Sequence, residues 1–188
     1  MKQQKQKEEL MKMVKTGVTV LMITLLALVP VSAEELKVGM KAPDWSFKDA
    51  DDKEFTPAFW NGKVMVINYV DPDESDLNEP FTDALKKAHK DKLLKDETYD
   101  GFGIVDCAAT WKPDFLIRSI AGDKAKKYKS IILFDYDATL RKLWGLKSDT
   151  HNVIVLDKNR VCRAIRREKI PDDQIAALVK LVIDLQSK

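Results

Sequence analysis

The sequence predicts an α/β fold: a central mixed sheet of about five strands, with helices on both faces and an N-terminal β-hairpin extension. Apolar runs of strand length alternate with segments of helical periodicity, which is typical of a largely parallel sheet covered on both sides. A tight turn joins the last two strands and adds an antiparallel edge. With 188 residues, 45% hydrophobic and 33% charged, the chain has the size and composition of one folded domain.

Residues 1–33 have the pattern of a secretory signal peptide. Five lysines precede an apolar run of 14 residues over 18–31, and the segment Val31-Ser32-Ala33 has small side chains at the two positions that a signal peptidase reads. A retained membrane anchor is the alternative, but a spanning helix needs about 20 apolar residues. We therefore expect export to a bacterial periplasm, cleavage after Ala33, and a domain over residues 34–188 with no stable membrane insertion.

The basic character of the chain comes mainly from this leader. The whole sequence has a formal net charge of +2, and residues 1–33 hold five lysines and two glutamates, which leaves residues 34–188 at about −1. This balance removes the electrostatic argument for nucleic-acid binding. A basic cluster remains, and its alternation favours the solvated face of a strand over an anion-binding patch. Its members are Arg160, Arg163, Arg166, Arg167 and Lys169.

The first half of the domain is predicted as follows. Residues 34–60 form an extended lead-in, and the acidic stretch 49–53 is typical of a hairpin turn. Residues 63–70 are almost continuously apolar, as in a strand covered on both faces. A helix should follow from about residue 75 to residue 90, because apolar residues recur there at helical spacing. This stripe consists of Leu77, Phe81, Ala84, Leu85 and Ala88.

The second half repeats the alternation and ends in a hairpin and a helix. The expected elements are a strand over 103–107, a weak helix over 113–128 that Gly122 interrupts, a strand over 131–134, a short helix over 137–144, strands over 152–157 and 161–165, and a last helix from Pro171. Asp137 is placed to cap the short helix and Gly145 to end it. Asp172 and Asp173 add favourable charge to the start of the last helix.

This order of elements resembles the thioredoxin fold, and four segments carry the likeness. They are MKAPDWSFKDADDKEF (40–55), GKVMVINYV (62–70), VIVLDKNRVCRAI (153–165) and IPDDQIAALVKLV (170–182). The first is similar to the opening of extracytoplasmic thioredoxin-like and peroxiredoxin-like proteins, and the others are similar to their motif strand, final hairpin and last helix. The resemblance implies a thioredoxin-like fold over most of residues 37–188.

A narrower resemblance is to the YtfJ-like family of exported thioredoxin-fold proteins, which lack the redox cysteines and have no settled activity. It is carried by the motif strand with its loop, by LFDYDATLRKLWGL (133–146), and by NVIVLDKNRV (152–161).

Thiol chemistry in this fold needs sulfur at the N-terminus of the helix after the motif strand, where the dipole stabilises thiolate. Counting from Gly62, or from Pro80, gives two registers for the cysteines that the resemblance implies. They fall at Glu74 and Leu77 in one register and at Pro72 and Ser75 in the other. Neither register supplies a cysteine, so disulfide exchange by a C-x-x-C pair has no residues to perform it.

Two further positions differ from the thioredoxin-like pattern. His151 stands where the resemblance implies a cis-proline, and a non-proline cis bond costs about 2.5–4 kcal/mol, so we expect a trans bond there. The string CAATWKPDF (107–115) looks like a redox motif but follows the wrong strand, and lysine and phenylalanine replace its cysteines. We expect Trp111 to pack in the core, as large aromatic side chains usually do.

Cys107 and Cys162 are the only thiols in the chain. The expected strand order separates them by three strand spacings, or roughly 14 Å at about 4.8 Å each. Because a disulfide needs Cα atoms within about 7 Å, an internal bridge is disfavoured. For Cys107 the sequence leaves open a small buried residue, a reactive thiol and an intermolecular disulfide.

An acidic run follows the motif strand, and it has two interpretations. Its members are Asp71, Asp73, Glu74, Asp76 and Glu79. Carboxylates at a helix N-terminus are stabilised by the helix dipole, so capping is the simpler interpretation. Calcium binding is the alternative, although the run lacks the glycine and the distal glutamate of a calcium loop.

These observations predict a binding or accessory module without dithiol chemistry, cofactor or metal. Two histidines, His89 and His151, are too few for a zinc site without further ligands. The expected partner is an unknown periplasmic protein or small ligand, bound where the parallel strands end. The candidate surface is Asp71, Asp73, Glu74, Ser75, Trp111, Thr150 and His151. The alternatives are a one-thiol oxidoreductase or peroxidase-like enzyme that uses Cys107, and a calcium-dependent structural protein.

Overall fold

The computed structural model describes residues 2–5, 7–8, 11 and 35–187. The chain divides into two units, residues 1–33 and residues 34–188. In the first unit the described residues are helical, while the predicted apolar run and cleavage site lie outside the described residues. Across the described part of the chain, no helix has both the length and the hydropathy needed to cross a bilayer.

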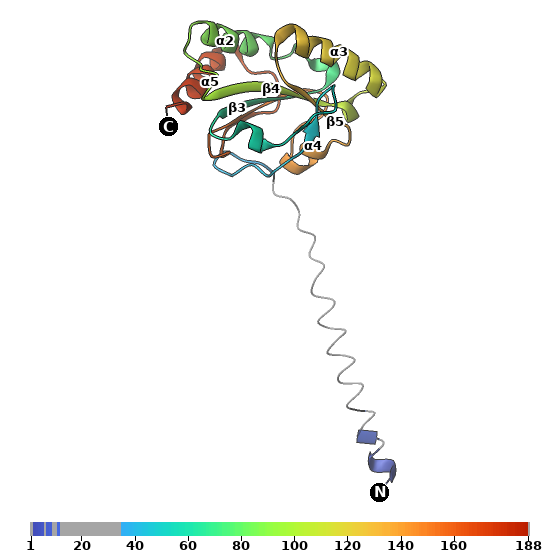
Figure 1. Ribbon diagram of the computed structural model, residues 1–188. Helices are drawn as coiled ribbons and strands as arrows, with labels where there is room; N and C mark the ends of the chain where they lie inside the picture. Colours follow the sequence, from blue (N-terminus) through green and yellow to red (C-terminus); the bar gives the residue numbers. More distant parts are fainter. Residues whose placement is uncertain (1, 6, 9–10, 12–34, 188) are drawn as a thin grey trace. The chain divides into compact units, whose positions relative to one another are not determined.

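One mixed sheet forms the centre of the second unit (Figure 1). Its described strands follow the order β2-β1-β5-β4-β3-β6-β7. The strands are β1 (Phe47–Lys48), β2 (Glu54–Phe55), β3 (Val64–Val70), β4 (Tyr99–Asp106), β5 (Ile132–Asp135), β6 (His151–Leu156) and β7 (Cys162–Arg166). β3, β4 and β5 are parallel neighbours, and β6 and β7 add antiparallel pairs. The predicted thioredoxin-like α/β fold is confirmed, with five central strands and the hairpin β1–β2.

Helices cover both faces of this sheet (Figure 1). They are α2 (Glu79–Lys90), α3 (Asp114–Tyr128), α4 (Thr139–Trp144) and α5 (Asp172–Leu185). The alternation of β3 shows the two cores: Val64 and Val66 pack with α2 and α5, whereas Met65, Ile67 and Tyr69 pack with α4 and the lead-in. A strand buried on both faces is therefore apolar at successive positions, as the sequence indicated.

The lead-in is held to the sheet by aromatic stacking. The short 3₁₀ helix η2 (Pro57–Trp60) presents Trp60, whose ring stacks on Phe102 of β4 with centroids 4.0 Å apart. The indole nitrogen of Trp60 donates a hydrogen bond of 2.9 Å to the Asp100 carboxylate. Trp45 and Phe47 extend the same cluster. This packing fixes the extended segment across one face of the sheet.

The lead-in also pairs with strands on both sides of the sheet. Near its start, the backbone nitrogen of Gly39 donates a 2.8 Å hydrogen bond to the backbone oxygen of Cys162. The backbone nitrogen of Cys162 in turn donates one of 2.8 Å to the backbone oxygen of Met40, so the lead-in covers the edge of β7. Further along, Lys48 of β1 pairs with Phe134 of β5. The hairpin extension therefore continues the central sheet.

Three local predictions need correction. The helix expected from residue 75 begins at Glu79, and a 3₁₀ turn, η3 (Pro72–Glu74), precedes it. Gly122 does not interrupt α3; it makes room for the lead-in, because a Cβ there would lie 3.1 Å from the Cβ of Ala50. Asp137 does not cap α4, since the carboxylate of Asp135 accepts hydrogen bonds from the first backbone nitrogens of that helix.

The basic cluster is partly structural. Arg163 pairs with Asp157 at 2.6 Å, and Arg160 pairs with Asp44. Arg167 donates 2.8 Å and 3.2 Å hydrogen bonds to the backbone oxygens of Gly145 and Leu36. These side chains hold the hairpin and the lead-in together, which a solvated face would not require.

The structure also corrects the expectation for Trp111. This side chain is 88% exposed, whereas Trp60 is 1% exposed. The anchoring aromatic of the core is therefore Trp60, and Trp111 projects from the loop before α3.

Substitution of the two tryptophans should separate these roles. Trp60→Ala should lower the free energy of unfolding by about 3–5 kcal/mol, because it leaves a cavity in a packed aromatic cluster. Trp111→Ala is the matched control and should change stability by less than about 0.5 kcal/mol. Urea unfolding followed by circular dichroism measures both. Equal losses in the two variants would contradict the assignment of Trp60 as the anchor.

Candidate functional site

The loop between β3 and α2 occupies the position where the redox motif of this fold would lie. Asp71 caps η3, and its carboxylate accepts a 2.8 Å hydrogen bond from the backbone nitrogen of Asp73. Burial raises the pKa of Asp71. Both cysteines lie elsewhere, buried and free, so the prediction of no internal disulfide is confirmed. The loop after β3 therefore offers backbone and carboxylate groups but no thiol.

Asn78 ties this loop to two distant segments, and the sequence analysis did not identify it. Its side-chain nitrogen donates hydrogen bonds of 3.0 Å and 3.4 Å to the backbone oxygens of His151 and Glu168. Its side-chain oxygen accepts one of 2.8 Å from the backbone nitrogen of Ile170. An asparagine one residue before Glu79-Pro80 is a helix-start signal, but its bonds to residues far along the chain have no local signal.

The three predicted surface segments do meet. The backbone nitrogen of Asp71 donates to the backbone oxygen of Thr150 at 3.0 Å. The carboxylate of Asp73 accepts a 2.9 Å hydrogen bond from the hydroxyl of Thr110 and pairs with Lys112, and these contacts lower the pKa of Asp73. The loops after β3 and β4 and the start of β6 are therefore joined.

His151 is buried at this junction, with 4% of its surface exposed. Its Nε2 lies 3.0 Å from the side-chain oxygen of Asn68 on β3. Because an amide oxygen only accepts, Nε2 carries the proton, and Nδ1 is the unprotonated nitrogen of the neutral ring. Burial lowers the pKa of His151 to about 4, so the ring is neutral at neutral pH. No described peptide bond is cis, which confirms the trans bond expected before His151.

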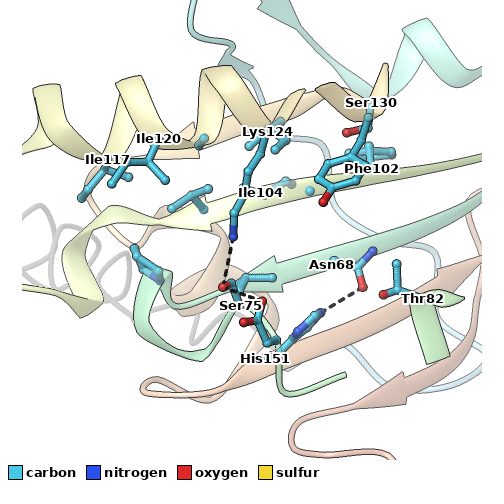
Figure 2. A pocket seen from close by; sticks show the side chains of 18 of the residues that line it. Asn68, Ser75, Thr82, Phe102, Ile104, Ile117, Ile120, Lys124, Ser130 and His151 are labelled. Atoms are coloured by element: carbon cyan, nitrogen blue, oxygen red, sulfur yellow. Dashed lines mark hydrogen bonds between the residues drawn. The ribbon is translucent and has the colours of Figure 1, made fainter. Parts of the chain in front are cut away.

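A groove of about 440 Å³ opens beside His151, between α2 and α3. Its lining includes Asn68 and Val70 of β3, Gly103 and Val105 of β4, Thr82 of α2, and Ile117 and Ile120 of α3. Of the predicted surface residues, Ser75 and His151 line this groove (Figure 2). Asp71, Asp73, Glu74, Trp111 and Thr150 belong to the surrounding loops and do not line it.

The groove exists partly because β4 lacks a side chain at Gly103. A Cβ at this position would meet Ile132 at 3.8 Å, an ordinary van der Waals distance, so a side chain would fit there and would take up part of the groove that Gly103 lines. The sequence analysis treated Gly103 only as part of a strand. A glycine inside a strand marks a bulge or a place where another group approaches closely, and this was the available signal.

Lys124 crosses the groove from α3 to the loop after β3 (Figure 2). Its Nζ donates to the hydroxyl of Ser75 at 3.4 Å. The other two lysines of the lining have carboxylate partners, Lys86 with Asp83 and Lys112 with Asp73. Within the described residues, Lys124 is thus the lining cation that lacks an ion pair.

Cys107 is buried beneath the loop after β4 and does not line the groove. Its Sγ contacts the backbone oxygen of Val105 at 3.8 Å. Burial, followed by the charges of Asp114 and Asp106, raises the pKa of the Cys107 thiol to about 12. A catalytic thiol needs the opposite shift, because thiolate is the nucleophile.

A buried polar network underlies the ends of β4 and β5, and the sequence analysis missed it as well. Asp106 pairs with Arg141 of α4 at 2.8 Å, and the hydroxyl of Tyr69 donates to Asp135 at 2.9 Å. Burial raises the pKa of both Asp106 and Tyr69. These contacts hold α4 against the sheet. Among the described residues, no group of three or more histidine, cysteine, aspartate or glutamate side chains is arranged to hold a metal ion.

Fold and site together define a thioredoxin-fold protein without a C-x-x-C pair. The chain belongs to a family of bacterial proteins of unknown function, YtfJ_HI0045, which matches residues 35–185. No curated protein matches the sequence.

Solved structures share the fold at low sequence identity. A putative protein disulfide isomerase from Bacteroides thetaiotaomicron is 19% identical with a TM-score of 0.61, over 81% of this chain and 92% of that one. A putative thiol:disulfide interchange protein DsbE from Chlorobium tepidum is 14% identical with a TM-score of 0.60, over 81% and 99%. A hypothetical protein from Sinorhizobium meliloti is 19% identical with a TM-score of 0.60, over 82% and 86%. These likenesses show the fold alone.

The buried His151 should make stability depend on pH. Its folded pKa of about 4 lies below the ordinary value of 6.5, so between these values the unfolded state binds more protons. The contribution of His151 to the free energy of unfolding is fully present above pH 6.5 and is lost as the pH falls towards 4. The total loss is about 3 kcal/mol.

The measurement is urea unfolding across this pH interval for the unmodified protein and for His151→Gln, which cannot titrate at that position. Other titrating groups are common to both proteins, so the difference between their unfolding free energies should shift by about 3 kcal/mol. A difference that stays constant across the interval would show that His151 titrates normally.

Proposed function

We propose that this protein is an exported binding or accessory module that performs no dithiol chemistry, and that its ligand or partner binds where β3 and β4 end. One observation carries the proposal: a groove of about 440 Å³ lies beside the position that would hold the redox cysteines. Pockets for small ligands measure about 300–1,000 Å³ and are mostly apolar with a few polar groups. Ser75 and His151 supply such groups here.

The location is part of this proposal. The leader pattern of residues 1–33 supports export, and a periplasmic protein could meet either a small molecule or another envelope protein at this surface. The exposed side chain of Trp111 and the joined loops around Asp73 offer contacts for such a partner.

The two alternatives find less support. A one-thiol enzyme would need Cys107 accessible and ionised, whereas this thiol is buried and its pKa is raised to about 12. A calcium-dependent structure would need the acidic run to converge on one point, whereas Asp71 caps η3 and Asp73 pairs with Lys112.

The thiols should react slowly in the folded protein. A rise of the Cys107 pKa from 9.0 to about 12 lowers its thiolate fraction about a thousandfold at neutral pH. Alkylation by iodoacetamide, followed by mass spectrometry, should label Cys107 only when denaturant is present. Fast labelling of Cys107 under native conditions would revive the one-thiol enzyme.

Photo-crosslinking in the native envelope tests the binding role. A benzoylphenylalanine at Trp111 should give a specific adduct, and the same residue at Phe59, a half-exposed aromatic of the lead-in, is the matched control. Asp73→Ala and His151→Ala, each in the Trp111 crosslinking background, should reduce the adduct at unchanged protein level. Identical adducts from Trp111 and Phe59, or adducts that neither alanine change affects, would count against a binding surface at this end of the sheet.

A further inference from the structure

We propose that the groove between α2 and α3 binds an amphiphile with one apolar chain and an anionic head group, of the long-chain carboxylate class. This inference rests on the proposed binding role and narrows it to a class of ligand. The apolar chain would lie along the floor of the groove, and the head group would bind Lys124.

The walls of the groove offer uncovered apolar surface. Ile117, Ile120 and Ala121 form one stripe of α3 and line the groove. Ile117 and Ala121 are buried because they also pack with Cys107 and Phe134, so the exposed apolar surface of this stripe comes mainly from Ile120. Ile120 is 49% exposed although it faces this cavity. Val105 and Ile132 continue the apolar surface on the sheet. Covering these side chains with a hydrocarbon chain removes their apolar surface from water, which favours binding.

Gly103 gives the floor the shape that a chain of methylene groups requires. Its neighbours in β4, Phe102 and Ile104, are buried, and Phe102 stacks in the aromatic cluster on the opposite face. A hypothetical Cβ at Gly103 would touch Ile132 at 3.8 Å without a clash, and because glycine has no Cβ this space belongs to the groove. A narrow hydrocarbon chain can occupy that space, whereas a side chain of the protein does not.

Lys124 is the group of the groove that can bind an anionic head group. Three lysines line the groove, together with Asp76 and Glu79 on the α2 side. Lys86 and Lys112 are paired with carboxylates of the protein. Lys124 forms no such pair: its Nζ donates to the hydroxyl of Ser75 at 3.4 Å, and that hydroxyl donates to the carboxylate of Asp76 at 3.1 Å. A ligand carboxylate in place of that hydroxyl would form a shorter, charge-assisted hydrogen bond. The same head group made cationic would meet Lys124 unfavourably.

Titration calorimetry of the purified exported protein with three dodecyl probes below their micelle concentrations tests the inference. Dodecanoate should bind, dodecanol should bind about tenfold more weakly, and dodecyltrimethylammonium should not bind. Equal affinities for dodecanoate and dodecanol would overturn the anionic head group, as would binding of the ammonium probe. Absence of binding by all three would overturn the ligand class.

Two variants with matched controls locate the site. Lys124→Glu should weaken dodecanoate about tenfold or more, whereas Lys126→Glu, on the same helix and outside the lining, should leave it unchanged. Gly103→Val should abolish binding while the protein stays folded, because valine suits a strand and its methyl groups enter the groove. Equal effects of the two lysine changes, or undiminished binding to a folded Gly103→Val protein, would overturn the proposal.

Different experimental outcomes would overturn the ligand class and the proposed binding surface. If the dodecyl probes do not bind but the Trp111 adduct still depends on Asp73 and His151, the ligand class is wrong and the binding surface stands. If dodecanoate binds but the adduct at Trp111 matches the control at Phe59, the groove binds amphiphiles and the partner surface is wrong.

Discussion

The buried side chain of Asn78 is the contact on which the arrangement of the site depends. It bonds to the backbone of His151, Glu168 and Ile170, and so joins the start of α2 to the start of β6 and to the segment before α5. Removing one partner from such a buried set leaves the others unsatisfied, which costs more than the hydrogen bond itself contributes. The position of His151 at the groove follows from this connection, because its own backbone oxygen is one of the acceptors.

The site keeps the architecture of the thioredoxin fold without the C-x-x-C pair. The loop after β3 is longer than a direct strand-to-helix turn, because η3 lies between the end of β3 and the start of α2 at Glu79. The start of the helix is therefore not where thiolate would be stabilised, and the carboxylates of the loop instead join neighbouring segments. What remains at the carboxyl ends of the strands is an open space bounded by α2 and α3. Shape and charge are the properties on which the proposed binding role rests.

Much of the fold could be predicted from the sequence, because strand and helix periodicities are local. The apolar run over residues 63–70 forms β3 as predicted, and Gly145, which has a left-handed backbone conformation, ends α4 as predicted. The candidate site was harder to predict from the sequence. Whether Trp111 is buried, and what Asn78 bonds to, depends on residues far away in the chain, and a single sequence holds no record of those contacts. The prediction that Gly122 interrupts α3 was wrong for the same reason, because the role of this glycine depends on its contact with Ala50 in the lead-in.

The pairing of the lead-in with β7 has a consequence for biosynthesis. Backbone hydrogen bonds join Met40 and Cys162, so a segment made early must wait for a strand made more than a hundred residues later. Contacts so distant in sequence close slowly, because chain entropy must be lost before they form. The border of the sheet at β7 therefore stays open while the nascent chain emerges. A chain in that state exposes unpaired strand edges, and such species aggregate readily and depend on chaperones.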